Sequence, residues 1–377
     1  MKKIAHVLVL PKMAGSQKFC HLLMSKLTDY KKYVLVSACE DVEICQRNEF
    51  INAFEAIGVE IIWCKHLKRN IGKSDIFGFV ELFHIFKKYE FDIVHTNSTK
   101  PGIIARIAAR ISGIKKIVHT VHGTSFYKGQ PVLKRFIYWA IEGVALQFGD
   151  VNVCVNKYYL KYYKFFFWKN NITIYNGYDF SELECFENNE SLKSEGRTLL
   201  FVGRLDKPKN PLMLIKAYAL LASKHPRVHL NIVGDGELRR ACENLVSSLG
   251  ITDQVTFHGW VEKPYAYYMN CDVFVCPSLY EAFGFTFIEA AYFKKPILAS
   301  NVEGIPEVVI DKKMGFLVDP HDYHALSEKM EQLINSPQLL DEMGEFSHNY
   351  VKNNFSICKS VNCYRSLYES NLKRGFL

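Results

Sequence analysis

The sequence lacks the features that mark several classes of protein. It has no run of about 18 apolar residues, so no segment is expected to cross a membrane as a helix. Its eleven cysteines include no C-x-x-C pair, and such a scattered set is typical of reduced thiols in a cytosolic protein. Neither half opens with G-x-G-x-x-G and a later acidic residue, so a nicotinamide enzyme is not expected.

The composition indicates an ordinary globular protein with two domains. A length of 377 residues suggests two domains of about 150 residues each. The charge is distributed unevenly, because residues 1–200 hold 28 Lys and Arg against 19 Asp and Glu, whereas residues 201–377 hold 19 against 20. Residues 101–170 alone hold 11 basic and 2 acidic residues. The first half is therefore expected to meet an acidic partner.

The first eleven residues combine two lysines with a short apolar run. A signal peptide would need a longer apolar run and a small-residue cleavage site, so we interpret this stretch as a first strand. Together with the cysteines, this interpretation predicts a cytoplasmic location.

Short β-branched runs alternate with helical patterns along the chain. This alternation predicts an α/β fold with two doubly wound, Rossmann-like domains that face a central cleft. We expect a first domain over 1–175, a linker over 176–197 and a second domain over 198–355. The C-terminal helix, about 356–377, is expected to pack back onto the first domain. The predicted strands are Ile4–Leu10, Tyr33–Ser37, Val59–Trp63, Ile93–His95, Ile117–Val121, Val151–Val155, Ile172–Ile174, Thr198–Val202, His229–Val233, Val255–His258, Val273–Cys276, Ile297–Ala299 and Gly315–Val318.

The stretch 277–289 has the pattern of a ligand-binding loop between the strand Val273–Cys276 and a helix over Thr286–Phe293. Ligands of open α/β sheets bind where strands give way to helix N-termini, whose N–H groups favour an anion. Glu281 and Glu289 beside such an anion site suit a nucleotide sugar, which carries hydroxyls next to its phosphates. The alternative is structural, with Thr286 and Glu289 forming a capping box.

Three further loops follow strands of the second half. Residues 203–211 hold the cations Arg204 and Lys209, with Asn210 as a predicted N-cap, and this combination predicts an anion site. The stretch Gly234-Asp235-Gly236 is only a weak match to a dinucleotide fingerprint. Trp260, followed by Val261, could frame a nucleobase or could serve in packing.

These motifs together resemble the retaining GT-B glycosyltransferases of family 4, over nearly all of the second domain. The order is G-R-L-D-x-x-K-N, then V-G-D-G-E-L-R, then P-S-x-x-E-A-F-G-x-x-x-x-E-A. The resemblance implies that Arg204 and Lys209 hold the donor diphosphate, that Glu281 bonds the donor sugar and that Glu289 bonds the ribose. It also implies that backbone N–H groups near the donor come from Phe283, Gly284 and Phe285.

The first domain is similar to the same family with one departure. Where that family has Gly-Gly-x-Glu after the first strand, this chain has Ala14-Gly15-Ser16-Gln17, so Gly15 is the remaining position for a close approach of backbone to donor. By resemblance, His122 touches the donor sugar, whereas His95 and His119 are expected to be structural. The segment from His95 to His122 is similar to members that act on lipid-carried glycans of bacterial surface polysaccharides, such as capsule or O-antigen lipopolysaccharide.

The resemblance implies a reaction and its reactants. A hexosyl or N-acetylhexosaminyl group moves with retention from a nucleotide sugar, with UDP as the expected carrier, to a glycan acceptor on a polyprenyl diphosphate. Arg204 and Lys209 would stabilise the leaving diphosphate. No D-x-D pair occurs, so neither a metal nor another cofactor is expected. Two alternatives remain: a GT-B nucleotide-sugar epimerase, and a non-catalytic protein that binds nucleotide sugars or glycans.

The segment 157–169 interleaves lysines with aromatic residues. Such a helix can lie on an anionic membrane, with its rings at the headgroups, and this predicts a peripheral position at the inner face of the plasma membrane. A buried aromatic helix with lysines on its wet face is the alternative. No nucleic-acid motif is present, so nucleic acid is not expected as a partner.

Overall fold

The computed structural model describes residues 1–39, 42–68, 72, 74–97, 99–124, 126, 130–163, 165–166, 170–187 and 196–370. The chain forms two compact units. The first contains Met1–Gly177 and the stretch that begins at Ile357, and the second is Tyr178–Ser356. In the described part of the chain, every helix is too short or too polar to cross a bilayer.

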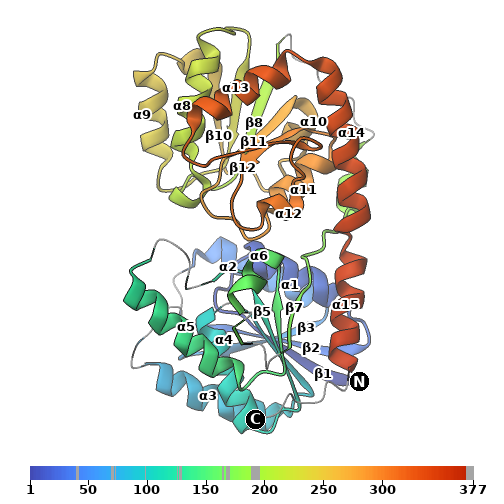
Figure 1. The fold of residues 1–377 in the computed structure, drawn as a ribbon. Helices are drawn as coiled ribbons and strands as arrows, with labels where there is room; N and C mark the ends of the chain where they lie inside the picture. Colours follow the sequence, from blue (N-terminus) through green and yellow to red (C-terminus); the bar gives the residue numbers. More distant parts are fainter. Residues whose placement is uncertain are drawn as a thin grey trace. The chain divides into compact units, whose positions relative to one another are not determined.

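The first unit is a seven-stranded parallel sheet with helices on both faces (Figure 1). Its strand order is β3-β2-β1-β4-β5-β6-β7. The strands are β1 (Lys2–Val7), β2 (Tyr30–Ser37), β3 (Val59–Cys64), β4 (Ile93–Asn97), β5 (Lys116–Val121), β6 (Val151–Cys154) and β7 (Asn170–Thr173). The helices are α1 (Gly15–Ser25), α2 (Ile44–Ala56), α3 (Ser74–Tyr89), α4 (Thr99–Ile111), α5 (Val132–Leu146), α6 (Lys157–Tyr163) and α15 (Ile357–Glu369).

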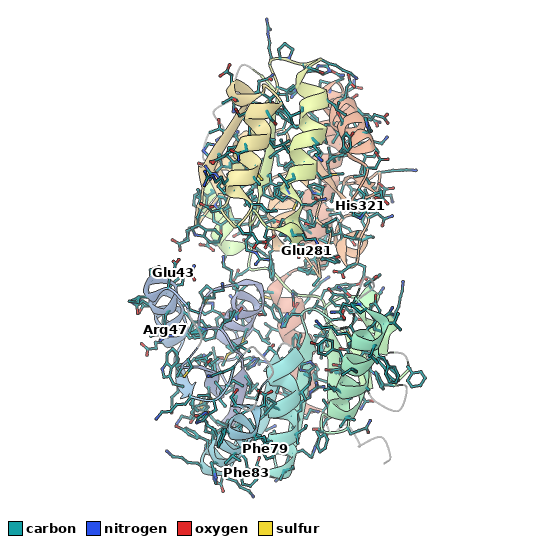
Figure 2. All side chains as sticks on the ribbon, turned by 90° about the vertical axis from the view of Figure 1, so that its left-hand side faces the viewer. Glu43, Arg47, Phe79, Phe83, Glu281 and His321 are labelled. Atoms are coloured by element: carbon teal, nitrogen blue, oxygen red, sulfur yellow. The ribbon has the colours of Figure 1, made fainter. Side chains whose placement is uncertain are left out.

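Alternation along the strands explains the two helical layers of this unit. On β2, Tyr33 and Leu35 share one core with α3 and α4, whereas Val34 and Val36 share another with α1 and α2. Successive side chains of a strand point to opposite faces, so a fully buried strand needs apolar residues at consecutive positions. Phe79 and Phe83 of α3 pack against the first of these cores (Figure 2).

The second unit is a six-stranded parallel sheet with the order β10-β9-β8-β11-β12-β13. Its strands are β8 (Thr198–Val202), β9 (His229–Val233), β10 (Val255–Gly259), β11 (Val273–Cys276), β12 (Ile297–Ser300) and β13 (Gly315–Val318). Its α-helices are α7 (Ser181–Glu187), α8 (Pro211–Ala222), α9 (Arg239–Ser248), α10 (Tyr265–Asn270), α11 (Phe285–Tyr292), α12 (Ile305–Val308), α13 (Tyr323–Ile334) and α14 (Pro337–Asn354). Two short 3-10 turns are η1 (Lys207–Lys209) and η2 (Thr252–Gln254).

Each sheet reverses its strand order at one place. In the first unit the reversal lies between β1 and β4, and in the second it lies between β8 and β11. At such a switch point the loops after the two neighbouring strands run to opposite sides of the sheet, which leaves a crevice at its carboxyl edge. The loops concerned follow β1 and β4 in one unit, and β8 and β11 in the other.

The prediction of doubly wound parallel sheets is confirmed, and all thirteen predicted strands correspond to strands of the structure. The second unit spans Tyr178–Ser356, whereas the expected second domain spans 198–355 after a linker over 176–197. The described part of the predicted linker contains α7, which is anchored because Leu183 is fully buried. Helix α15 belongs to the first unit and packs against α1.

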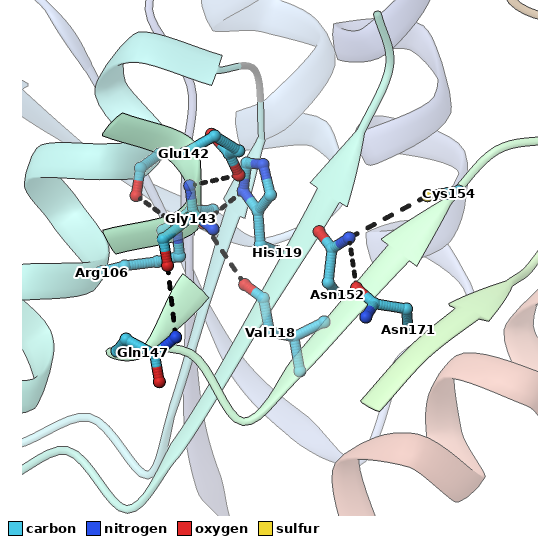
Figure 3. Close-up of polar contacts among 11 residues, drawn as sticks. Arg106, Val118, His119, Glu142, Gly143, Gln147, Asn152, Cys154 and Asn171 are labelled. Atoms are coloured by element: carbon cyan, nitrogen blue, oxygen red, sulfur yellow. Dashed lines mark hydrogen bonds and ion pairs between the residues drawn. The ribbon is translucent and has the colours of Figure 1, made fainter. Parts of the chain in front are cut away.

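A fully buried ion pair joins two helices on one face of the first sheet (Figure 3). Arg106 of α4 donates from Nη2 to Oε1 of Glu142 on α5 at 2.9 Å, and both side chains are inaccessible to solvent. The Nε of Arg106 also donates to the carbonyl of Gly102 at 2.9 Å. Removing both charges from water is costly, so each charge depends on the other for compensation.

We expect Glu142→Gln to destabilise the first unit by about 3–5 kcal/mol, because it leaves the buried Arg106 guanidinium without a counter-charge. The matched control is the double variant Arg106→Met with Glu142→Leu, which removes both charges and should recover most of that loss. Urea unfolding of the three proteins measures the difference. Equal stability of the single and double variants would contradict the assigned role of the pair.

Candidate functional site

The loops after β8 and β11 lie against each other at the switch point of the second sheet. The backbone N–H of Leu279 donates to the carbonyl of Pro208 at 2.8 Å, which joins the two loops directly. Both loops leave the sheet at its carboxyl edge, where ligands of such folds bind. Glu281 lies in the loop between β11 and α11 (Figure 2).

The central contact of this edge is an ion pair between Lys209 and Glu281. The side chains are 14% and 16% exposed, so both are largely shielded from water but can still be reached by a ligand. Burial alone would lower the pKa of Lys209, but the Glu281 carboxylate and its hydrogen bond outweigh that effect and raise the pKa above its ordinary value. Lys209 is therefore a permanent cation at this edge of the sheet.

Arg204 lies beside this pair and is more open to solvent. It is 65% exposed and bonds Asp206 at 2.8 Å. Asp206 also accepts the backbone N–H of Lys209 at 3.2 Å, so one carboxylate orients the loop that carries both cations. Asn210 stands at the N-cap position of α8 with a left-handed φ of 57°, but its amide donates to the carbonyl of Pro320 and does not cap the helix.

A glycine allows the turn that starts α11. Gly284 has φ +81°, and a Cβ there would lie 2.4 Å from the Phe287 ring. The helix begins at Phe285, one residue before the predicted start, so the capping-box alternative for Thr286 and Glu289 is wrong. The ring of Phe283 is buried and meets Phe285 at 5.5 Å, so this phenylalanine points inward.

The carboxylate of Glu289 is held by two tyrosines. Tyr178 donates to Oε1 at 3.1 Å and Tyr268 donates to Oε2 at 2.9 Å. Burial and the neighbouring carboxylate raise the pKa of both hydroxyls, so they remain protonated donors. A carboxylate can accept about four hydrogen bonds. The two tyrosines therefore fix the rotamer of Glu289 without using all of its acceptor sites. No local pattern around Glu289 indicates these partners, because they come from residues distant in the chain.

Glu303 is a second contact that the sequence analysis missed. Its Oε2 accepts the backbone N–H of Glu281 at 3.0 Å, and the N–H of Gly304 donates to the carbonyl of Glu281. Glu303 has a φ of 44°, a left-handed conformation that is uncommon outside glycine. This loop therefore fixes the backbone of Glu281 from the side of β12.

The Gly-Asp-Gly stretch after β9 serves in packing. A Cβ on Gly234 would lie 1.9 Å from the carbonyl oxygen of Gly203, and one on Gly236 would lie 2.5 Å from that of Leu205. The N–H of Leu205 donates to the carbonyl of Asp235 at 2.9 Å. These glycines let two backbones touch and so support the loop that carries Arg204 and Lys209.

Trp260 follows β10 and is 67% exposed, so the packing alternative for its ring is wrong. Val261 beside it is half-buried. Their expected contact with a nucleobase stays a prediction.

In the first unit, the loop after β1 leads to Gly15 at the start of α1. A Cβ at Gly15 would meet no atom within 4 Å, so the fold itself does not require glycine there. Gln17, which stands where the resemblance expects a glutamate, donates to the carbonyl of Leu10 at 3.2 Å and accepts from Ser16. This amide therefore secures the loop before α1.

His122 follows β5 and lies above a group of buried polar side chains. Its Nε2 lies 3.2 Å from Oδ1 of Asn97. Because an amide oxygen only accepts, Nε2 carries the proton and Nδ1 is left as an acceptor. Burial lowers the pKa of His122 to about 4, so its ring is neutral near pH 7.

Three more histidines lie on the strands β1, β4 and β5 of the same sheet. His6 of β1 and His95 of β4 are ring neighbours at 4.4 Å, and His95 bonds Tyr368 and Thr120 at 2.7 Å each. His119 bonds Thr96 at 2.8 Å on the other face of the sheet. These contacts give His95 and His119 the structural surroundings that the sequence predicted.

The structure thus assembles part of the predicted site. Lys209, Glu281 and Arg204 are brought together through direct contacts or Asp206, whereas Glu289 is anchored separately by tyrosines. Gly15 and His122 belong to the first unit. Among the described residues, no three His, Cys, Asp or Glu side chains are grouped so that they could hold a metal ion.

Family models match both halves of the chain. The one described as Glycosyl transferases group 1 matches residues 185–350, and the one described as Glycosyltransferase Family 4 matches residues 34–182. Among curated proteins, the UDP-Gal:alpha-D-GlcNAc-diphosphoundecaprenol alpha-1,3-galactosyltransferase of Escherichia coli is 28% identical, with 97% of this chain and 96% of that protein covered. The capsular polysaccharide biosynthesis glycosyltransferase CapM of Staphylococcus aureus is 29% identical, with coverages of 82% and 85%.

Solved structures share the fold. Sucrose-phosphate synthase from Thermosynechococcus elongatus has a TM-score of 0.78 at 21% identity and covers 98% of each chain. Alr3699/HepE of Anabaena, solved with UDP and glucose, has a TM-score of 0.78 at 18% identity and covers 97% of this chain and 99% of its own. At these identities the likeness establishes the arrangement of the elements, which is the GT-B fold.

The buried histidines predict that the first unit weakens in acid. In the unfolded chain a histidine has a pKa of about 6.5, whereas burial holds the pKa of His122 near 4 and that of His6 near 3. The unfolded state therefore binds more protons below pH 6.5, and stability is lost as the pH falls towards the folded values. Between pH 7.5 and pH 5, we expect a loss of about 2 kcal/mol from His122 alone.

Hydrogen exchange at pH 7.5 and pH 5, corrected for the intrinsic exchange rates, would measure this loss in each unit separately. The protection of β1, β4 and β5 should fall at the lower pH. Equal protection at both pH values would contradict the neutral, buried state of these rings.

Proposed function

Because this chain belongs to the family 4 glycosyltransferases of the GT-B fold, we propose that it transfers a hexosyl or N-acetylhexosaminyl group from UDP to a glycan acceptor carried on a polyprenyl diphosphate. The activities for which the Escherichia coli and Staphylococcus aureus relatives are named support this reaction and a place in bacterial surface-polysaccharide synthesis. The observation that carries the proposal is the Lys209–Glu281 pair at the switch point of the second sheet.

The two cations of this edge suit a diphosphate leaving group. Breaking the bond between sugar and phosphate places negative charge on the diphosphate, and preorganised cations in a shielded crevice stabilise that charge. Arg204 can offer paired N–H groups, whereas Lys209 acts as a point charge. Because these side chains supply the positive charge, the reaction is proposed to need no metal ion.

Glu281 and His122 are assigned to the donor sugar. The carboxylate of Glu281 accepts sugar hydroxyls and, because it is engaged by Lys209, it orients the sugar and is not the attacking group. The neutral ring of His122 accepts a hydroxyl through Nδ1. Transfer proceeds with retention. The oxygen of the acceptor hydroxyl bonds to the anomeric carbon on the face that the diphosphate leaves, the bond between that carbon and the phosphate oxygen breaks, and the phosphate oxygen takes the hydroxyl proton.

The remaining assigned residues contact other parts of the donor. Glu289, fixed by its two tyrosines, accepts the ribose hydroxyls, and the start of α11 near Gly284 offers backbone N–H groups to the phosphate. Gly15 leaves room for the donor beside α1, since even a Cβ at this position would meet no atom within 4 Å.

We expect Lys209→Ala and Glu281→Gln each to lower the turnover of UDP-sugar transfer by about 10²–10³, the usual cost of removing a group that stabilises transition-state charge. The measurement is product formation at saturating donor. The matched control is Lys224→Ala in the same unit, which breaks the surface pair of Lys224 and Glu331 and should leave turnover unchanged. Near-normal rates in both site variants would show that the site has been misassigned.

Nucleotide binding can be tested without the acceptor. UDP at about 100 times its dissociation constant should add about 2.7 kcal/mol to the stability of the full chain. The increase should persist in EDTA and should shrink in Lys209→Ala, and GDP, ADP and NAD serve as comparisons. A shift lost in EDTA would contradict metal independence, and no shift with any nucleoside diphosphate would contradict the nucleotide-sugar site. Binding without transfer would favour the non-catalytic alternative, and conversion of the donor without an acceptor would favour the epimerase.

A further inference from the structure

Helix α5 presents an apolar face to solvent. Six large apolar side chains of this one helix are exposed, from 38% at Ile141 to 85% at Val132. We call this set the apolar face of α5, and it consists of Val132, Leu133, Phe136, Ile137, Ile141 and Val144. Single exposed apolar residues are normal on a protein surface, but a contiguous set marks an interaction site.

The spacing of these residues shows that they form one face. They recur at intervals of three and four positions, which is the repeat of one side of a helix. The opposite side of the same helix is buried, at Glu142, Ala145 and Leu146. Exposed large apolar residues of the second unit lie on separate elements instead, at Leu220, Leu249, Trp260, Tyr280 and Phe346.

Aromatic rings extend the apolar face of α5 at one flank. The ring of Trp139 stacks against Phe136, with centroids 5.8 Å apart, and meets the edge of Phe165 at 5.1 Å. Phe165, which follows α6, is itself 63% exposed. Tryptophan and phenylalanine are the residues that amphipathic helices place at the boundary between headgroups and acyl chains.

The charge around the apolar face of α5 is positive. Residues 101–170 contain only two acidic residues, Glu142 and Asp150, and each is paired internally with an arginine. The basic residues of the same stretch include Lys134 on α5, which is exposed, and Lys157 and Lys161 on α6, which are also exposed. A surface that combines apolar and cationic groups and has its carboxylates neutralised complements an anionic lipid surface.

The position of α5 in the first unit relates the apolar face to the site. Helix α5 follows β5 after the loop that begins with His122. A helix in such a unit runs back antiparallel to its strand, so its first turn lies at the carboxyl edge of the sheet. Val132, Leu133 and Phe136 therefore belong to the end of α5 that is nearest to His122.

We propose that the apolar face of α5 docks on an anionic lipid bilayer and thereby brings the carboxyl edge of the first sheet to a lipid-carried acceptor. The docking is inferred from the surface of α5 alone. The lipid-carried acceptor, in contrast, rests on the proposed function. The proposal also places the membrane contact on α5, whereas the sequence predicted it on the segment 157–169. In the segment 157–169, Tyr159 and Tyr163 are buried, so α6 turns these rings inward, and 164 and 167–169 lie outside the described residues.

Flotation of the full chain with vesicles tests the docking. Vesicles of phosphatidylcholine with phosphatidylglycerol are compared with vesicles of phosphatidylcholine alone, at low and high salt. The test variant is Leu133→Gln with Phe136→Gln and Ile137→Gln, which keeps good helix formers at three exposed positions. The matched control is Leu220→Gln with Leu249→Gln and Phe346→Gln, which removes as many exposed apolar residues from the second unit.

The wild type and the control should float with the anionic vesicles, more weakly at high salt, and the α5 variant should bind about tenfold more weakly or worse. Equal flotation of the α5 variant and the wild type, or no flotation of the wild type, would overturn the proposal. Light scattering that shows a wild-type dimer and a monomeric α5 variant, without flotation, would assign this face to contact between two copies and would also overturn it.

The UDP stability shift, measured on the same samples, separates this proposal from the proposed function. Hydrogen-exchange protection of β1, β4 and β5 at the wild-type level in the α5 variant shows that the first unit, to which α5 belongs, is folded, so that its loss of flotation supports the docking. If the wild type floats through α5 but UDP gives no shift, the docking stands and the nucleotide-sugar function fails.

Discussion

Parallel strands place their carboxyl ends at one edge of a sheet, and the candidate site depends on this constraint. Lys209 and Glu281 are 72 positions apart in the chain, but each follows a strand that borders the switch point of the second sheet. The bond from the N–H of Leu279 to the carbonyl of Pro208 then fixes the two loops to each other. The sheet sets the coarse position of the ion pair, and one backbone hydrogen bond sets the fine position.

Much of this arrangement could be predicted from the sequence, because buried parallel strands have a strong local signal. The run Val273–Cys276 is apolar at every position, as a strand covered on both faces must be, and its predicted bounds agree with β11. The loop between β8 and α8 could be located for the same reason. Once the strands are known, residues that follow them fall at the carboxyl edge.

The parts that the sequence analysis missed depend on contacts between distant residues. Tyr178 and Tyr268 reach Glu289 from positions 111 and 21 residues away, and nothing near Glu289 indicates them. Glu303 adopts a left-handed φ that no local pattern announces. The apolar face of α5 was missed for a different reason. Periodicity shows that a helix has an apolar side, and such a side is expected to be buried. In α5 the apolar side is exposed, whereas the polar residue Glu142 lies on the buried side.

The two units place their paired charges differently. In the first, charges are neutralised inside: Arg106 by Glu142, Arg110 by Asp150, and the histidines through burial. The net positive charge of this unit therefore comes from lysines at its surface, because the ring of His122 is neutral. In the second unit, cations are gathered at the carboxyl edge, each with a carboxylate partner.

The two carboxylate partners respond differently to an incoming diphosphate. The pair of Arg204 and Asp206 is exposed at its arginine and therefore stabilises little, so a phosphate can replace the aspartate at small cost. The pair of Lys209 and Glu281 is largely shielded, and separating it would leave a carboxylate without its counter-charge. An ammonium has three N–H groups, however, and a carboxylate has further lone pairs. Lys209 can therefore bond a phosphate oxygen while it keeps Glu281, and Glu281 can accept a sugar hydroxyl while it keeps Lys209. In the proposed reaction, this single ion pair would span the bond that is broken, with its cation on the diphosphate and its carboxylate on the sugar.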